Sequence, residues 1–546
     1  MAVSRVVSIL FRGFQARSIG CALSAAALGG CASSGYFHDR PIVWQVDDQQ
    51  HIDEPEELPF DRYATLADAF ALRRVTRLLE LHDSEPAHNT NALDEVPDST
   101  WFTNRIGVRR VTPEEAARGV SAVGPPRLPL EVTGGKPGGA NPGMMAKDPQ
   151  GRRFVIKFDT KENPGMQTAT NTIVNRIFWT LGYNVPNDTI VSFDRSQVFV
   201  GAGATLKDEM GRKFPMTESN LAETLASAPR YPGGVFRASA SEFIAGIPKG
   251  GWTKEGVRDD DRNDHTPHEH RREVRALRVF SAWLNHTDIK QDNTLDAYVD
   301  EGGKRYLRHY LLDFGEALAG QAAEAHKPET GYEHWIDYEY HTAAAFSFGL
   351  WARPWEHLEE TRWPSIGLFS AKHFDPESWR PMSPYWAFDE ADAADKYWAA
   401  KLVLRFDKPL LRAIVAVGEL EDAKAEEYLV NALYERARII GQRYLEAVTP
   451  LDHFEITRNE ICAVDMSVYH GLVTSGLVEV LDEHNDVAFD TLVGERGQVC
   501  IPIHADDRYR VYRLRMLRRS VSYPVMQVHF KGGQAPRILG VIRIEG

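Results

Sequence analysis

The feature that most constrains the fold is a polar loop joined by two short strands to an Asp-Phe-Gly motif. The loop runs from Asn285 to Asn293, and the motif is Asp313-Phe314-Gly315. Between them, Thr294–Val299 and Tyr306–Leu312 have the composition of strands, and Asp300–Gly303 predicts the turn that joins them. The two open ends of a β-hairpin lie together, so the sequence predicts that the loop and the motif are neighbours.

The residue types in these two motifs are those that transfer of a phosphoryl group requires. The reaction needs a carboxylate that orients the attacking hydroxyl, oxygen ligands that hold Mg²⁺ against the phosphates, and a cation that offsets developing charge. We expect Asp288 to be the base, Lys290 the charge stabiliser, and Asn293 and Asp313 the metal ligands. The alternative is a solvated polar loop followed by an ordinary buried strand. The order of the motifs and the hairpin between them favour the first interpretation.

A glycine-rich segment and a strand lysine precede these motifs. Gly138 and Gly139 belong to a turn in which backbone N–H groups can approach phosphates without a Cβ in the way. The segment does not match G-x-G-x-x-G, so a flexible loop is the alternative. Lys157 lies in the predicted strand Phe154–Phe158 and is expected to bind the nucleotide phosphates, whereas a lone strand lysine usually faces solvent.

The strand lysine, the loop with Asp288 and Asn293, and the Asp313 motif resemble the protein-kinase-like superfamily in its atypical branches. These branches are the HipA-type serine kinases, the phosphoinositide 3/4-kinases and the spore-coat CotH kinases. The resemblance extends over about Leu130 to Val448. It implies an α+β, bilobal kinase-like fold that uses ATP with Mg²⁺ or Mn²⁺. It also implies transfer of the γ-phosphate to a hydroxyl of a protein, lipid or glycan.

One helix departs from the kinase pattern. In kinases, the helix after the lysine strand supplies a Glu that pairs with that lysine. Here the predicted helix Thr168–Leu181 has no acid in its body and places Asn171 on its inner face. We expect Glu162 or another acid to substitute, or Lys157 to be held less rigidly with low or absent activity. The alternative function is therefore a pseudokinase-like scaffold that binds an envelope partner.

The chain of 546 residues is long enough for two or three domains. After Pro450 the pattern changes to short alternating segments, which predict a C-terminal antiparallel β domain. The predicted organisation is a signal peptide at 1–30, a tether at 31–59, a helical and loop region at 60–128, a kinase-like N-lobe at 129–245, a helical C-lobe at 246–450 and a small β-rich domain at 451–546.

The N-terminus has the order of basic, apolar and small residues that is typical of an export signal. Leu28-Gly29-Gly30-Cys31 follows the apolar part, as in bacterial lipoprotein signals, and Cys31 is the expected site of lipidation. Ala32 favours the outer membrane, so we expect a lipid-anchored protein of the cell envelope. The alternatives are an ordinary cleaved signal and a start codon placed too early. No run approaches the ~18 apolar residues of a membrane-spanning helix.

The formal net charge of −14 argues against nucleic acid as a partner and against a polybasic membrane contact. The expected partners are a nucleotide, an unidentified hydroxyl acceptor, and the membrane through the lipid anchor. One basic stretch in the β domain is either a solvated strand face or a site for an anionic surface polymer. It contains Arg508, Arg510, Arg513, Arg515, Arg518 and Arg519.

Two further groups of side chains leave alternatives open. Cys462 and Cys500 remain besides Cys31 after the predicted cleavage, and export permits a disulfide between them, although two buried free cysteines fit equally well. The polar run with His265, His268 and His270 could bind a transition metal, but this spacing is a weak zinc signal. A loop that caps a helix or contacts substrate is the favoured interpretation of that run.

Overall fold

The computed structural model describes residues 37–79, 85–120, 123–136, 138–139, 141–208, 211–320, 327–359, 363–457, 459–482, 484–503, 506–519 and 521–543. The predicted signal peptide, Cys31 and the start of the tether lie outside the described residues. The chain from Arg40 onward belongs to one compact unit. Its fold is mixed α+β, as predicted, with several separate sheets. None of the described helices combines the length and the apolarity needed to cross a bilayer.

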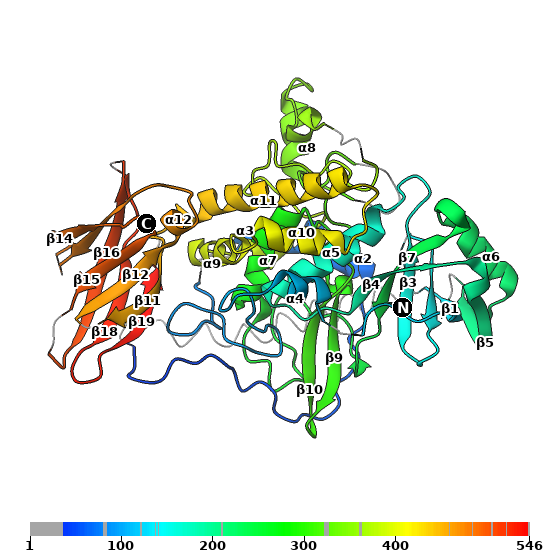
Figure 1. Ribbon diagram of the computed structural model, residues 1–546, viewed down its shortest axis with the longest axis horizontal. Coiled ribbons are helices and arrows are strands. Elements are labelled where there is room, and N and C mark those ends of the chain that lie inside the picture. Colours follow the sequence, from blue (N-terminus) through cyan, green and yellow to red (C-terminus); the bar gives the residue numbers. More distant parts are fainter. Residues whose placement is uncertain are drawn as a thin grey trace. The chain divides into compact units, whose positions relative to one another are not determined.

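A seven-stranded sheet, in the order β4-β7-β3-β2-β1-β5-β6, forms the first part of this fold (Figure 1). Its strands are β1 (Leu130–Gly135), β2 (Gly143–Lys147), β3 (Arg153–Phe158), β4 (Asp188–Phe193), β5 (Val198–Lys207), β6 (Lys213–Pro215) and β7 (Phe236–Glu242). Alternation along β3 places Ile156 and Phe158 in a hydrophobic core, so Lys157 lies on the opposite face. Helix α6 (Glu218–Ser227) covers the core face through Leu221.

Helix α5 (Met166–Leu181) packs against β3, β4 and β7. Its apolar side chains, including Ile173 and Ile177, belong to the large helical core and not to the core under α6. Helix α5 therefore lies on the face of the sheet that carries Lys157. The helix ends at Gly182, where a Cβ would collide with the ring of Phe102.

Helix α7 (Arg272–Leu284) leads into the polar loop and the predicted hairpin. Asn285 ends the helix with a φ of 47°, the left-handed conformation that Asn tolerates after a helix. Strands β9 (Thr294–Glu301) and β10 (Lys304–Leu311) pair antiparallel, with β8 (Ile247–Pro248) beside β9, so the hairpin is confirmed. At its open end, the N–H of Leu312 donates to the carbonyl of Asn293 at 2.9 Å.

The helical region contains the largest hydrophobic core, in which Trp283 and Trp398 are fully buried. Its helical segments are α2 (Arg62–Ala67), the π-helical turn Asp68–Leu72, α3 (Arg73–Leu79), α4 (Pro113–Arg118), α8 (Tyr338–Phe346), α9 (Ala393–Val403), α10 (Lys408–Ala416) and α11 (Ala423–Leu445). Helix α7 packs on α9 and α11 at the centre of this region. Phe348 has a φ of 53°, which turns the chain just after the last residue of α8.

The predicted C-terminal antiparallel sheet is confirmed. One sheet has the order β11-β12-β15, and the other has the order β14-β13-β16-β18-β19 with β17 beside β16. The elements are β11 (Leu451–Thr457), β12 (Glu460–Asp465), α12 (Met466–Tyr469), β13 (Leu477–Leu481), β14 (Val487–Leu492), β15 (Gln498–Pro502), β16 (Tyr509–Arg518), β17 (Val521–Ser522), β18 (Met526–Lys531) and β19 (Arg537–Arg543). The two sheets share one core, which includes Val499 and Leu514. Cys462 and Cys500 are cross-strand partners and form a disulfide.

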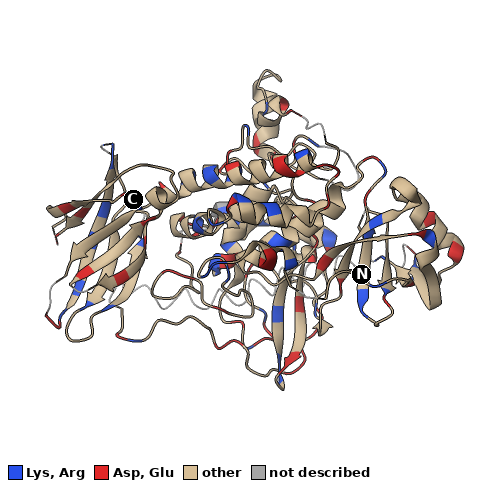
Figure 2. Ribbon diagram, viewed as in Figure 1, with Lys and Arg blue, Asp and Glu red and all other residues tan. Residues whose placement is uncertain are grey.

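Basic and acidic residues are interspersed over the helices and the sheets (Figure 2). The arginines of β16 follow this pattern, because Arg510 pairs with Asp506 at 2.6 Å and Arg515 pairs with Glu479 at 2.7 Å. These internal ion pairs favour the interpretation of the basic stretch as a solvated strand face over a polymer-binding site.

Candidate active site

The predicted site residues line one cleft with a volume of about 920 Å³. They are Gly138, Gly139, Lys157, Asp288, Lys290, Asn293 and Asp313. The cleft wall also includes the start of α5, where Gln167 and Asn171 lie, and parts of the N-terminal helical segment, such as Leu66. The fold thus brings together the glycine-rich turn, the strand lysine, the polar loop and the Asp-Phe-Gly motif.

The polar loop holds Asp288 through two neighbouring side chains. Lys290 Nζ lies 2.8 Å from Asp288 Oδ2, and Asn293 Nδ2 donates to the same oxygen at 2.8 Å. Asn293 Nδ2 also donates to the backbone carbonyl of Asp288 at 2.8 Å, so its amide oxygen is left for another partner. Burial opposes the charge of Lys290, but the Asp288 carboxylate outweighs burial and raises the pKa of Lys290.

Asp313 is held in an uncommon backbone conformation beside the strand lysine. Its φ of 55° lies in the left-handed region, which a non-glycine residue adopts at a cost. Lys157 Nζ lies 2.7 Å from Asp313 Oδ1. Burial opposes ionisation of Asp313, but Lys157 outweighs burial and lowers the pKa of the carboxyl. Of the acids expected to substitute for the helix Glu, Glu162 is exposed, and the acid that pairs with Lys157 is Asp313.

The Phe of the motif is anchored in the protein interior. Phe314 is fully buried and stacks on Phe178 of α5, with ring centroids 5.2 Å apart. The ring of His286 lies 5.9 Å from that of Phe314 and 6.0 Å from that of Phe178, so the three rings form one cluster. His286 Nδ1 also lies 3.1 Å from the backbone oxygen of Glu316. These contacts fix the polar loop and the Asp-Phe-Gly motif against α5.

Asn171 lies on the inner face of α5, as predicted, and connects three elements. Its Nδ2 donates to Asp188 Oδ2 at 2.8 Å, and its Oδ1 accepts from the backbone N–H of Phe314 at 3.0 Å. Asp188 also accepts from the hydroxyl of Ser241 on β7. Burial raises the pKa of Asp188 to about 6, although Ser241, Arg176 and Lys157 oppose this rise. Asn171 therefore positions the backbone next to Asp313.

Asp188 and Glu316 are site residues that the sequence analysis missed. Asp188 opens a predicted strand and carries no local signal of its contact with Asn171. Glu316 follows the Asp-Phe-Gly motif directly and lines the cleft. Burial, reinforced by the Asp288 charge, raises the pKa of Glu316 to about 7. Its position directly after the Asp-Phe-Gly motif could have identified Glu316 as a site residue from the sequence.

The donor atoms at the end of the hairpin fit a magnesium ion. Mg²⁺ prefers oxygen ligands, and proteins usually supply only a few of them beside the phosphates of a substrate. Asn293 uses both amide hydrogens within the loop, so its carbonyl oxygen is the group that remains. Asp313 keeps its carboxylate ionised, as a metal ligand must be.

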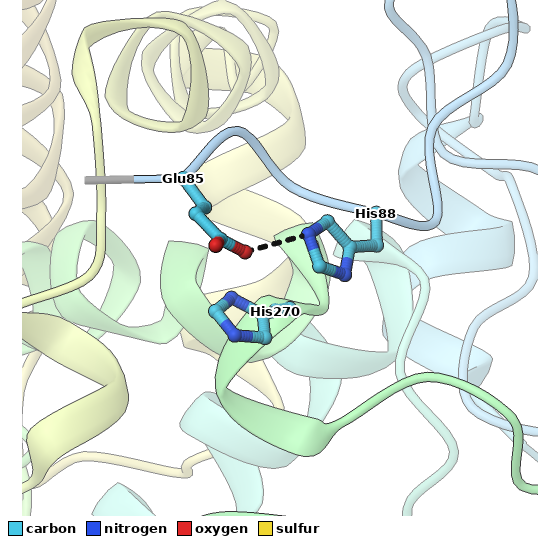
Figure 3. Close-up of side chains that lie close together, drawn as sticks. All are labelled: Glu85, His88 and His270. Atoms are coloured by element: carbon cyan, nitrogen blue, oxygen red, sulfur yellow. Dashed lines mark ion pairs between the residues drawn. The ribbon is translucent and has the colours of Figure 1, made fainter. Parts of the chain in front are cut away.

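The three histidines of the polar run do not come together as a metal site among the described residues. His268 is buried and contacts Asp264 at 2.8 Å, so this part of the run belongs to the protein interior. His270 instead stacks on His88 near Glu85, as Figure 3 shows. Arg275 Nη2 donates to His270 Nδ1 at 2.8 Å, which occupies that nitrogen and places a positive charge beside it. The cluster of Glu85, His88 and His270 is therefore poorly suited to a cation.

Comparison with known proteins adds no family to this description. No model of a known protein family matches the chain, and a search of curated proteins also found no match.

Proposed function

We propose that the chain is an ATP- and Mg²⁺-dependent phosphotransferase of the kinase-like class. One observation carries the proposal: Lys157, Asp288, Asn293 and Asp313 line the same cleft, although they come from three separate segments of the chain. In this proposal the bilobal arrangement consists of the seven-stranded sheet with α5 and the helical region with the hairpin. The acceptor is a hydroxyl group of a protein, a lipid or a glycan.

Each residue has a defined part in the proposed reaction. Asp288 orients the acceptor hydroxyl and takes its proton, while the new bond forms between the hydroxyl oxygen and the γ-phosphorus. The bond from the γ-phosphorus to the bridging oxygen breaks, and ADP leaves. Lys290 offsets the charge that develops on the transferred group, and Lys157 holds the α- and β-phosphates. Asn293 and Asp313 hold Mg²⁺, which neutralises charge on the phosphates when it is bound.

The proposed place of action is the bacterial cell envelope. The lipoprotein-like sequence up to Cys31 supports a lipid anchor, most consistent with the outer membrane. The disulfide between Cys462 and Cys500 fits a compartment outside the reducing cytoplasm.

The second candidate is a pseudokinase-like scaffold. It is favoured by the lack of any acid in α5 and by the pairing of Lys157 with Asp313, the expected metal ligand. Under this alternative the cleft binds a nucleotide without transferring phosphate, and an envelope partner binds elsewhere on the chain. The two candidates differ in whether a phosphoryl group leaves ATP.

The test is turnover of ATP by the Asp288→Asn variant. Loss of the orienting base should reduce phosphoryl transfer by about 100-fold or more while ATP still binds. Asp300→Asn is the control, because Asp300 is an exposed carboxylate at the far end of the hairpin, does not line the cleft and should retain full transfer. Equal rates of phosphoryl transfer by wild-type protein and Asp288→Asn would contradict the role of Asp288 as the base. Absence of ATP turnover in the wild-type protein with every acceptor class tested would favour the scaffold.

A further inference from the structure

Lys136 lines the cleft but has no role in the reaction proposed above. It follows β1 directly in the glycine-rich segment and lines the same cleft as Lys157 and Asp313. Burial, together with the positive charge of Lys157, lowers the pKa of Lys136 to about 8, while Asp313 opposes this shift. The amine thus lies within electrostatic reach of the strand lysine and the expected metal ligand.

The glycines of the turn make room for the Lys136 side chain. A Cβ on Gly139 would lie 2.6 Å from Lys136 Nζ, and a Cβ on Gly143 would lie 2.9 Å from Lys136 Cδ. Real side chains do not approach this closely, so a methyl group at Gly139 would require the flexible end of Lys136 to move from its present position. Gly138 differs, because a Cβ there would meet nothing within 4 Å. The absence of a side chain at Gly139 is therefore tied to the position of this lysine.

The charge of Lys136 is not committed to a carboxylate. Two other lysines of the cleft are paired with carboxylates, Lys157 with Asp313 at 2.7 Å and Lys290 with Asp288 at 2.8 Å. A third, Lys254, donates to the backbone carbonyl of Pro384 at 3.4 Å. Lys136 forms no such ion pair within the described part of the chain. A half-buried ammonium group that faces a cleft without a carboxylate partner is suited to bind an anion, and phosphate is the anion that this cleft is proposed to hold.

We infer that Lys136 is a second phosphate-binding lysine, which holds the triphosphate of the nucleotide beneath the glycine-rich turn. This inference rests on the proposed function. The glycine-rich turn then binds phosphate through Lys136 as well as through its backbone N–H groups. This second contact explains how the turn can bind phosphate without the G-x-G-x-x-G pattern. Lys136 and Lys157 then contact the phosphates from two neighbouring parts of the sheet, and Lys157 remains near Asp313.

The first test compares ATP with adenosine as ligands of the Lys136→Met variant, by calorimetry on the compact unit from Arg40 onward. Loss of a charged hydrogen bond should weaken ATP binding by about ten-fold or more. Adenosine carries no phosphate, so its affinity should not change, and Lys136→Arg should restore most of the ATP affinity. Lys147→Met is the matched control, because Lys147 lies on the same sheet, pairs with Glu131 and does not line the cleft.

The second test uses the two neighbouring glycines. Gly138 and Gly139 have similar backbone conformations, with φ of 69° and 77°, so an alanine strains both positions alike. Only the methyl group at Gly139 meets Lys136, so Gly139→Ala should weaken ATP binding more than Gly138→Ala does. The effects of Gly139→Ala and Lys136→Met should also be less than additive when combined.

Three outcomes separate the inference from the proposed function. Equal ATP affinity of Lys136→Met and wild-type protein would overturn the inference and leave the phosphotransferase proposal standing. Equal weakening of ATP and adenosine would also overturn it, because that result indicates a general change of the cleft. No ATP binding by the wild-type protein would overturn both.

Discussion

Asp313 and Gly251 show how single residues set the geometry of the cleft. The left-handed backbone of Asp313, with a φ of 55°, aims its carboxylate at Lys157. On the far side of the polar loop, Gly251 packs so closely that a Cβ would collide with the carbonyl oxygen of Gln291 and lie 2.9 Å from Thr294 Oγ1. The loop that holds Asp288 is therefore fixed by close backbone contact as well as by its own hydrogen bonds.

The variant Gly251→Ala should displace the polar loop. The added methyl group can be accommodated only by a shift of Gln291, which should lower the free energy of unfolding by about 1–3 kcal/mol. Phosphoryl transfer should fall as well, because Asp288 and Asn293 lie in the displaced loop. Gly107→Ala is the control, since a Cβ there has ordinary contacts of 3.5 Å or more. Unchanged unfolding of Gly251→Ala in a denaturant titration would contradict the close packing.

Asp188 should make stability depend on pH. Its carboxyl has a pKa of about 6 in the folded protein and an ordinary value of 3.8, so deprotonation costs folding free energy. This cost is absent below the ordinary value, grows as the pH rises, and is complete above the folded pKa. Asp188→Asn should gain up to about 3 kcal/mol relative to wild-type protein between about pH 4 and pH 7. Urea titrations of both proteins across this range measure the difference in their free energies of unfolding. A difference that does not change with pH would contradict the raised pKa of Asp188.

At the scale of elements, helix α5 is connected to the Asp-Phe-Gly motif through an amide side chain. Asn171 of α5 joins Asp188 of β4 to the backbone of Phe314. The side chain thus links the sheet, the helix and the Asp-Phe-Gly motif in a chain of hydrogen bonds. Helix α5 therefore positions Asp313 through the neighbouring backbone N–H of Phe314. Lys157 pairs directly with the carboxylate of Asp313.

The hydrogen-bond chain can be tested by exchanging the side chains of Asn171 and Asp188. Asn171→Asp should impair transfer, because two carboxylates then face each other in a buried site. The double variant Asn171→Asp with Asp188→Asn should recover much of the loss, since the amide can again donate to a carboxylate and Phe314 N–H keeps its acceptor. Asn171→Leu, which removes both hydrogen bonds, should not be rescued by Asp188→Asn. Equal activity of the single and double variants would contradict the proposed connection.

The sequence predicted those elements whose signals are local. The hairpin of β9 and β10 follows from its strand composition and its Gly302-Gly303 turn, and alternation places Lys157 opposite a buried face. The partner of Lys157 could not be predicted, because Asp313 is distant in sequence and comes near only through folding. Strands β11, β12 and β14 were missed although each pairs with a strand next to it in the sequence. Strand β14, for example, is an edge strand exposed along nearly its whole length, so it has no alternation of buried and exposed residues to predict it from.

At the scale of the whole molecule, buried ion pairs connect the helical region with the C-terminal sheets. Asp395 of α9 is fully buried and contacts Arg272 at 2.9 Å and Arg275 at 3.1 Å, both on α7. On the same helix, Lys401 contacts Asp452 of β11 at 2.8 Å. Helix α9 therefore bridges the core below the polar loop and the first C-terminal strand.

The variant Asp395→Asn should destabilise the fold strongly. It leaves Arg275 without a buried counter-charge and Arg272 with Asp94 as its remaining carboxylate partner, which should cost about 3–5 kcal/mol of unfolding free energy. Asp506→Asn is the control, because its partner Arg510 is on the surface and such pairs contribute about 0–1 kcal/mol. Thermal unfolding should show a clear fall of the midpoint for Asp395→Asn alone. Similar midpoints for the two variants would contradict the structural role of this buried pair.

The central claim is that the cleft holds ATP together with Mg²⁺. The direct measurement is calorimetry of ATP binding to the compact unit from Arg40 onward, with and without Mg²⁺, for wild-type protein and Asp313→Ala. Asp300→Ala is the control, because Asp300 is an exposed carboxylate at the far end of the same hairpin. We expect Mg²⁺-dependent binding by the wild-type protein and by Asp300→Ala, and loss of that dependence in Asp313→Ala. No binding to the wild-type protein, or equal Mg²⁺-dependent binding to Asp313→Ala, would contradict it.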